Sequence, residues 1–399
     1  MSPVTLWWNL YFPEIVKTGL TAAVIALGLM LLAAPAVAQV RVNPIDRIFA
    51  PLKSDKAPGV AVEVIHHGHV IFQRGYGVAD LRTHEHITPQ TNFRLASCTK
   101  QFTAMAIMLL VHDGKLHYDE RLTDVFPEFP AYGRAITIRH LLNHTSGLKD
   151  YEDLMPAQYP KTRDEKIPQI HEAGVLKLLA QQTATDFPPG SKWRYSNSGY
   201  VVLGMVVAKV SGEPFGRFLE ERIFAPLEMK ETVLYERGKN HVAQRAYGHT
   251  LKRGRWMQTD QSSTSATQGD GGIYSSVDDL AKWDAALTSF KVLPENEMRE
   301  AWIPVNAPAD GSEAMQSGQN AVSYGFGWFL DPYRGHKRMW HYGETMGFRT
   351  TIQRFPEDEL TVIVLANRAD VDAAGLALKV ADLYLDLDLD VSGKPKAGR

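Results

Sequence analysis

A serine and a lysine, Ser97 and Lys100, stand one helical turn apart near the start of a predicted helix. Apolar residues recur at helical spacing from Thr99 to Val111, and Gly114 occupies a typical stop position. The hydroxyl and the amine are therefore expected to project from one face of the first turn. A desolvated lysine beside a helix N-terminus is biased towards the neutral amine, which can take the proton of a serine nucleophile. The pair predicts an activated nucleophile, although many S-x-x-K patterns are only a helix cap followed by a solvated lysine.

Two further polar motifs lie later in the chain. Tyr195-Ser196-Asn197 stands at the entry of a predicted helix, where polar side chains point out of the scaffold or act as a simple N-cap. His341 and Gly343 belong to a run that is typical of a β-strand. Each motif is a weak signal when it is taken alone.

Cofactor and metal sites are not favoured by the remaining motifs. The glycine cluster at 269–272 indicates a close approach of backbone segments, since neither G-x-G-x-x-G nor a phosphate-loop lysine is present. Histidines gather at a predicted hairpin tip and a neighbouring loop, but no H-x-x-H pattern or acidic ligand set completes a metal site. These histidines are His66, His67, His69, His84 and His86.

The composition is that of an ordinary globular chain. Its 399 residues are 44% hydrophobic and 22% charged, enough to bury a large core. The formal net charge of -2 predicts no strong attraction to nucleic acid or to anionic lipid. Cys98 is the single cysteine, so the chain forms no internal disulfide, and we expect it to be a small packing residue.

The first 38 residues carry the pattern of an export signal. Lys17 precedes an uncharged run from Thr18 to Ala34, and Ala36-Val37-Ala38 supplies the small-x-small pattern of a cleavage site. We expect cleavage before residue 39 and a periplasmic or secreted location in a bacterium. An uncleaved membrane anchor stays open as an alternative, because the run is near the lower length limit for spanning.

The remaining chain reads as strands first, helices in the middle and strands last. Strand-like runs cover 59–65 and 69–74, and four more lie between 324 and 366 before a final helix at 373–385. Residues 149–175 are polar and unpatterned, so we expect a long loop that acts as a lid or a binding element.

The order of the three motifs resembles the penicillin-recognising serine hydrolases. The branch in question contains class C β-lactamases, D,D-carboxypeptidases, D-aminopeptidases and family VIII esterases. Stretches along the whole mature chain support the resemblance, namely ITIRHLLNHTSGL, FPPGSKWRYSNSGY, GGIYSSVDDLAKW, YGFGW and LTVIVLANR. It implies an α+β, β-lactamase/transpeptidase-like domain over 39–399, with an antiparallel sheet from both chain ends flanked by helices. A mostly helical region would be inserted at roughly 115–300.

The resemblance also implies roles for individual residues. Ser97 would attack a carbonyl and form an acyl-enzyme, while Lys100 and Tyr195 would share the proton transfers, with the nearby ammonium lowering the affinity of the phenol for its proton. Either Lys100 or Tyr195 could be the base in acylation. Asn197 would bind the substrate amide and orient Lys100, and the backbone N–H groups of Ser97 and Glu344 would form the oxyanion hole. No metal or organic cofactor is needed.

The third motif departs from the β-lactamase pattern. It reads His341-Tyr342-Gly343 where those enzymes usually carry Lys-Thr-Gly. We expect His341 and Gly343 to contact substrate, with His341 acting as a weak, pH-dependent clamp for a carboxylate. This favours an exported serine hydrolase acting on D-amino-acid peptides, of carboxypeptidase or aminopeptidase type, or on small esters. The alternatives are a class C-like β-lactamase and a non-catalytic sensor that binds penicillin or cell-wall peptides; the oligomeric state stays open.

Overall fold

The computed structural model describes residues 43–156, 167–310 and 322–385. The predicted signal peptide, residues 1–38, lies outside these ranges. All elements below belong to one compact unit that begins at Pro44. None of the described helices has the length and apolar character needed to cross a membrane.

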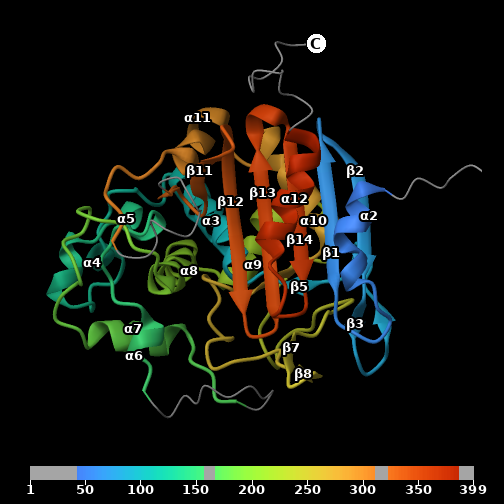
Figure 1. Ribbon diagram of the computed structural model, residues 1–399. Helices are drawn as coiled ribbons and strands as arrows, with labels where there is room; N and C mark the ends of the chain where they lie inside the picture. Colours follow the sequence, from blue (N-terminus) through green and yellow to red (C-terminus); the bar gives the residue numbers. More distant parts are fainter. Residues whose placement is uncertain (1–42, 157–166, 311–321, 386–399) are drawn as a thin grey trace, which may run out of the picture. The chain divides into compact units, whose positions relative to one another are not determined.

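The core element is a seven-stranded antiparallel sheet assembled from both ends of the chain (Figure 1). Its strands, in spatial order, are β10 (Ser323–Tyr324), β11 (Phe329–Tyr333), β12 (His336–Thr345), β13 (Phe348–Phe355), β14 (Leu360–Ala366), β1 (Val60–His66) and β2 (His69–Tyr76). The two chain ends meet where β1 pairs with β14, in a register that runs from Val60 opposite Ala366 to His66 opposite Leu360. The antiparallel sheet predicted from the two ends is confirmed.

Strand β14 is buried along its whole length because helices cover both faces of the sheet. Val362 and Val364 pack with α12 (Ala373–Leu385) and the short α2 (Pro44–Phe49), whereas Ile363 and Leu365 join the larger core on the opposite face. The larger core contains α3 (Lys100–His112) and α10 (Val277–Thr288). A continuous apolar run is the expected sequence for such a doubly covered strand.

The region between the two sheet-forming ends is mostly helical. Its helices and helical turns, besides α3 and α10, are η2 (Ala96–Thr99), α4 (Leu122–Val125), η3 (Ala131–Ala135), α5 (Ile138–Leu142), α6 (Tyr151–Leu154), α7 (Glu172–Ala180), α8 (Asn197–Ser211), α9 (Phe215–Leu219), η4 (Glu220–Phe224), α11 (Glu295–Met298) and η5 (Arg299–Trp302). Helical turns also follow α2, as η1 (Ala50–Leu52), and β13, as η7 (Pro356–Asp358).

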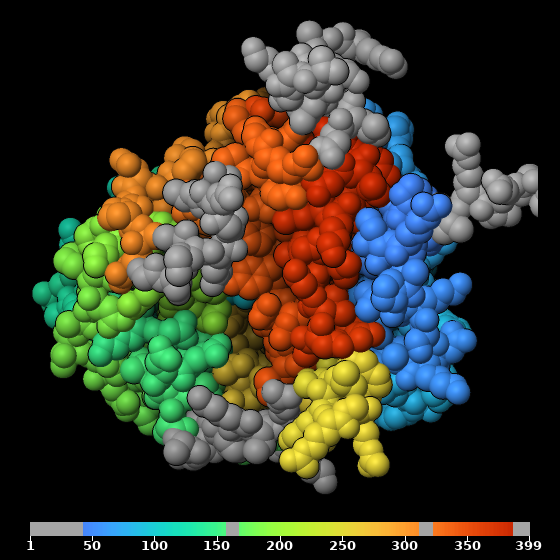
Figure 2. Space-filling model, in the orientation of Figure 1, coloured from blue at the N-terminus to red at the C-terminus, as the bar shows by residue number. Residues whose placement is uncertain are grey.

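Three small sheets complete the fold. The first joins β3 (Val78–Asp80) to β4 (Glu85–His86), and the second joins β5 (Phe93–Arg94) and β6 (Val233–Leu234) through β9 (Ile273–Ser275). The third joins β7 (His249–Lys252) to β8 (Arg255–Gln258). In Figure 2 the early segments in blue lie directly beside the late segments in red. Across this junction the Gly59 N–H donates to Asn367 Oδ1, over 308 positions of sequence.

Two predictions from local pattern were partly wrong. The loop expected over 149–175 contains α6 and the start of α7. The run Tyr324 to Trp328 is not a strand beyond its first residue, because Gly325 and Gly327 let the chain turn. Gly327 has φ of +80°, and a Cβ there would lie 2.8 Å from the Lys100 carbonyl oxygen. The turn therefore needs glycine where it packs against the start of α3.

Candidate active site

Ser97 is the one half-buried residue in an otherwise buried segment. Every other residue from Thr91 to Lys100 is buried. Ser97 lies in the 3-10 turn η2, which directly precedes α3. It is not in the first turn of the α-helix itself. Ala96, directly before it, has φ of +47°, a backbone state that costs a non-glycine residue about 1–3 kcal/mol. The surrounding packing therefore holds the serine on a sharp turn.

Lys100 connects Ser97 to two other segments of the chain. Its Nζ atom lies 3.0 Å from Ser97 Oγ, 2.8 Å from Asn197 Oδ1 and 3.0 Å from the Asp270 carbonyl oxygen. The side chain is fully buried, and burial lowers its pKa to about 8, although nearby carboxylates act in the opposite direction. A neutral amine fits these contacts, because its two N–H groups serve the Asn197 and Asp270 oxygens while its lone pair accepts from the Ser97 hydroxyl. The geometry allows Lys100 to act as a general base.

Tyr195 lies against the same pair from the segment that leads into α8. Ser97 is a hydrogen-bond partner of its hydroxyl, and Lys100 Nζ lies 4.8 Å from the centre of its ring. Burial raises the pKa of Tyr195 well above its ordinary value. The expectation of a lowered pKa is therefore wrong, because desolvation of the phenolate is the largest effect on it. The phenol stays protonated at neutral pH and can donate a proton.

Asn197 is the first residue of α8 and links the lysine to an acidic segment. Its Oδ1 accepts from Lys100, and its Nδ2 donates to Glu152 Oε1 at 3.0 Å. Its backbone N–H donates to Asp150 Oδ2 at 2.7 Å. The side chain is thus held at both ends, as its predicted role in orienting Lys100 requires.

His341 is fully buried in β12 and hydrogen-bonded on both ring nitrogens. Its Nε2 lies 2.9 Å from the Tyr324 hydroxyl, and its Nδ1 lies 2.7 Å from the Tyr342 carbonyl oxygen. Burial lowers its pKa to about 3, and the nearby Lys100 adds to this effect. A carbonyl oxygen can only accept, so Nδ1 carries the proton and Nε2 accepts from Tyr324. The expected pH-dependent charge on His341 is therefore wrong, and any contribution to substrate binding comes from a neutral ring.

Gly343 and Glu344 lie where β12 passes the nucleophile. Pairing of β12 with β11 ends at Trp340, and the following residues pair with β13 alone and pack against η2. A Cβ on Gly343 would lie 2.1 Å from the Leu95 carbonyl oxygen, so glycine is required for the strand to approach this closely. The next residue, Glu344, has an exposed side chain. The oxyanion hole formed by the N–H groups of Ser97 and Glu344 stays a prediction.

Three carboxylates beside Lys100 were missed by the sequence reasoning. Asp150, Glu152 and Asp270 all act electrostatically on the lysine. Desolvation of the carboxyl group and the two aspartates raise the pKa of Glu152 to about 7, and burial raises the pKa of Asp150. The glycine cluster around Asp270 was the available signal, since it predicted a close backbone approach. Nothing in the local pattern marked Asp150 or Glu152.

Two histidines of the β1–β2 hairpin contact other side chains of the protein. His67 Nδ1 lies 2.5 Å from Glu359 Oε2, and its ring lies against that of His66. Across the part of the chain that the structure describes, no group of three or more histidine, cysteine, aspartate or glutamate residues is arranged to hold a metal ion. Cys98 is buried beside the His341 carbonyl oxygen and Thr350, as expected of a packing residue.

Known proteins resemble the chain over most of its length. It is 30% identical over 332 residues to penicillin-binding protein 4* of Bacillus subtilis, which covers 80% of this chain and 70% of that protein. It is 26% identical over 340 residues to the D-aminopeptidase of Brucella ovis, which covers 83% of this chain and 60% of that protein. The chain thus spans well under two thirds of the aminopeptidase.

Solved structures share the fold. The octameric penicillin-binding protein homologue from Pyrococcus abyssi superimposes with a TM-score of 0.74 at 25% identity, over 86% of this chain and 76% of that one. The D-amino acid amidase from Ochrobactrum anthropi SV3 gives a TM-score of 0.71 at 25% identity, over 86% and 97% of the two chains. The family model described as Beta-lactamase matches residues 45–385. The chain therefore belongs to the beta-lactamase family of serine hydrolases.

Proposed function

We propose that the protein is an exported serine acyl hydrolase that forms an acyl-enzyme at Ser97. The observation that carries this proposal is the Lys100 side chain, whose amine lies 3.0 Å from the Ser97 hydroxyl with a pKa lowered to about 8. A site that only binds a ligand does not need a buried amine with a lowered pKa, because burying an ionisable group costs free energy. Residues 1–38 would act as the export signal or, if uncleaved, as a membrane anchor.

The contacts around Lys100 support a mechanism with two half-reactions. Lys100 accepts the Ser97 proton as the serine oxygen attacks the substrate carbonyl, and the N–H groups of Ser97 and Glu344 stabilise the oxyanion. The protonated Tyr195 donates its proton to the leaving group and regains a proton from Lys100. Water then attacks the ester carbonyl by the reverse route and releases Ser97.

The acidic residues beside Lys100 favour substrates with a free amino group. Glu152 is partly exposed and sits one hydrogen bond from Asn197, so it can face a substrate ammonium group held near Ser97. The neutral His341 offers no positive charge to a substrate carboxylate. We therefore favour D-amino-acid amides, esters and amino-terminal peptides over carboxy-terminal D,D-peptides and β-lactams. The names of the D-aminopeptidase and D-amino acid amidase relatives support this preference.

A substrate panel tests the proposal. We expect Ser97-dependent turnover of D-alanine p-nitroanilide, weaker turnover of its N-acetyl derivative, and little turnover of nitrocefin or of a D-Ala-D-Ala peptide. Ser97→Ala is the matched control for each substrate. Equal turnover rates in wild type and Ser97→Ala would contradict the catalytic proposal. The alternative of a non-catalytic sensor would then be favoured. A clear preference for the D-Ala-D-Ala peptide would instead keep the chemistry and overturn the amine preference.

A further inference from the structure

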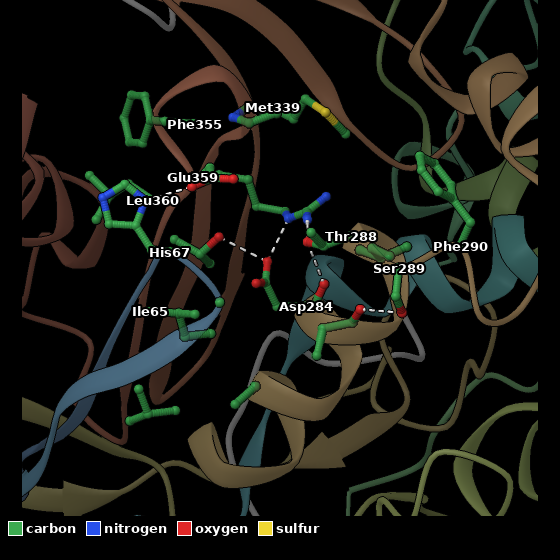
Figure 3. Close-up of a pocket in the computed structure, with 18 of the residues that line it drawn as sticks. Ile65, His67, Asp284, Thr288, Ser289, Phe290, Met339, Phe355, Glu359 and Leu360 are labelled. Atoms are coloured by element: carbon green, nitrogen blue, oxygen red, sulfur yellow. Dashed lines mark hydrogen bonds and ion pairs between the residues drawn. The ribbon is translucent and has the colours of Figure 1, made fainter. Parts of the chain in front are cut away.

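A cavity lies away from Ser97, between the C-terminal end of α10 and the sheet (Figure 3). Its volume is about 610 Å³, within the range of about 300–1,000 Å³ typical of small-molecule sites. Figure 3 shows Asp284 and Thr288 of α10 on one side of the space and Met339 on the other. None of the residues assigned above to catalysis lines it.

The walls are largely apolar. The side chains that carry this character are Ile65, Val70, Leu287, Phe290, Trp302 and Met339. Val70 remains 47% exposed, which is unusual for valine on a strand and marks an open rim. An apolar ligand would therefore bury surface that the folded chain leaves in contact with water.

One buried ion pair gives the cavity its polar contact. Arg354 Nε donates to Asp284 Oδ1 at 2.6 Å, and Arg354 Nη2 donates to Thr288 Oγ1 at 2.8 Å. Thr361 Oγ1 donates to the same Asp284 oxygen at 2.8 Å. The two charged residues are 5% and 6% exposed. The third nitrogen, Arg354 Nη1, makes no hydrogen bond to the residues that the structure describes.

The charge balance selects the kind of acceptor. Asp284 already neutralises Arg354, and Glu359, which pairs with His67, adds a further carboxylate to the cavity lining. A ligand carboxylate would bring a second negative charge to a single buried guanidinium, which is unfavourable in a poorly solvated site. A neutral carbonyl oxygen would satisfy the free N–H without that cost.

We propose that this cavity binds a neutral, largely apolar small molecule that carries one carbonyl oxygen. The site is separate from the acyl-transfer site. Met339 lines the cavity two residues before His341 on the same strand, so an occupied cavity lies next to the β12 segment that passes the nucleophile.

Calorimetric titration with 2-octanone tests the proposal, and octanoate serves as the anion of the same chain length. Both are added to full-length protein in wild-type and Ser97→Ala forms, because neither compound can then be confused with a substrate of Ser97. We expect saturable binding of the ketone to both forms with one site, and at least about tenfold weaker binding of octanoate. No saturable binding of the ketone, or equal affinity for octanoate, would overturn the proposal.

Ala285 allows the cavity to be filled without altering the core. It lines the cavity on α10 and is exposed. Ala285→Trp should weaken ketone binding at least about tenfold, whereas the matched control Ala285→Ser should leave it unchanged. Hydrolysis of p-nitrophenyl butyrate at the wild-type rate by both variants would show that each is folded. Unchanged ketone affinity in a folded Ala285→Trp variant would place the ligand elsewhere and overturn the assignment.

Discussion

The proposed proton transfer at Ser97 depends on the Lys100 amine. It is buried among Ser97, Asn197 and the Asp270 carbonyl, and burial lowers its pKa to about 8. Because the active form is the neutral amine, kcat/KM should rise with pH and level off above an apparent pKa near 8. Tyr195 stays protonated over this range, so it should not add a second rise.

Lys100→Met is the corresponding variant. Removing the base should reduce kcat/KM for p-nitrophenyl butyrate by about 10²–10⁴-fold and abolish the rise near pH 8. Steady-state kinetics between pH 6 and about 9 would measure both effects. A variant that keeps the wild-type pH profile would identify another group as the base.

The proposed preference for a substrate amine rests on Glu152. Its pKa is raised to about 7, so its negative charge is gained as pH rises through neutrality. The KM for D-alanine p-nitroanilide should therefore fall as pH increases from about 6 to about 7, below the range of about 7.7–8.0 in which the α-amino group of the substrate loses its proton. Glu152→Gln keeps an oxygen for the Asn197 Nδ2 donor but removes the charge, and should raise this KM about tenfold.

The N-acetyl substrate is the control for Glu152, because it has no ammonium group. Its KM should be the same in wild type and Glu152→Gln at every pH. If the variant weakened both substrates equally, the carboxylate would be acting on the shape of the site and not on substrate charge.

Strand β12 controls how closely the sheet approaches the nucleophile. A Cβ at Gly343 would lie 2.1 Å from the Leu95 carbonyl oxygen, two residues before Ser97. Gly343→Ala should push β12 and η2 apart, destabilise the protein by about 1–3 kcal/mol and lower kcat more than it raises KM. Thermal unfolding and p-nitrophenyl butyrate kinetics would measure the two effects.

Gly271 provides a matched control for the Gly343→Ala variant. It also lies beside the nucleophile turn, but a Cβ there would lie 3.7 Å from its nearest neighbour in Ala96. Gly271→Ala should therefore leave stability within about 0.5 kcal/mol of wild type. Equal losses in both variants would show that the close approach at Gly343 is not what holds the strand in place.

For the whole molecule, the seam between the two chain ends contains a buried carboxyl group. Glu63 of β1 is fully buried, and its Oε2 accepts from Gln73 at 2.6 Å. Burial raises its pKa to about 8, from an ordinary value near 4.5. The folded state therefore holds this proton where the unfolded chain loses it, so this contribution to stability is present below pH 4.5 and is lost as pH rises towards 8.

The variant Glu63→Gln tests how the protonation of Glu63 contributes to the free energy of unfolding. Other groups titrate in the same range, so the quantity to follow is the free energy of unfolding of the variant minus that of wild type. This difference should increase in favour of the variant from pH 5 to about 8, by urea denaturation at each pH. A difference that stays constant with pH would mean that Glu63 is ionised in the folded protein.

Much of the fold was predictable because it rests on local patterns. The final helix was placed at its observed bounds, and the strands that pair across the two chain ends followed from apolar runs such as Leu360–Ala366. The nucleophile helix was shifted by one residue, since the 3-10 turn that holds Ser97 depends on packing around Ala96. The α6 helix was missed because its short, polar sequence has no periodic apolar face.

The sequence by itself determined the identity and order of the reactive groups. Ser97, Lys100, Tyr195, Asn197 and His341 could be named from type, spacing and resemblance. Their protonation states came only from the tertiary structure, which buries His341, desolvates the Tyr195 hydroxyl and brings Asp150, Glu152 and Asp270 beside Lys100. The physical reason is that spacing fixes which groups share a turn, whereas desolvation and the field of neighbouring charges depend on segments that meet only when the chain folds.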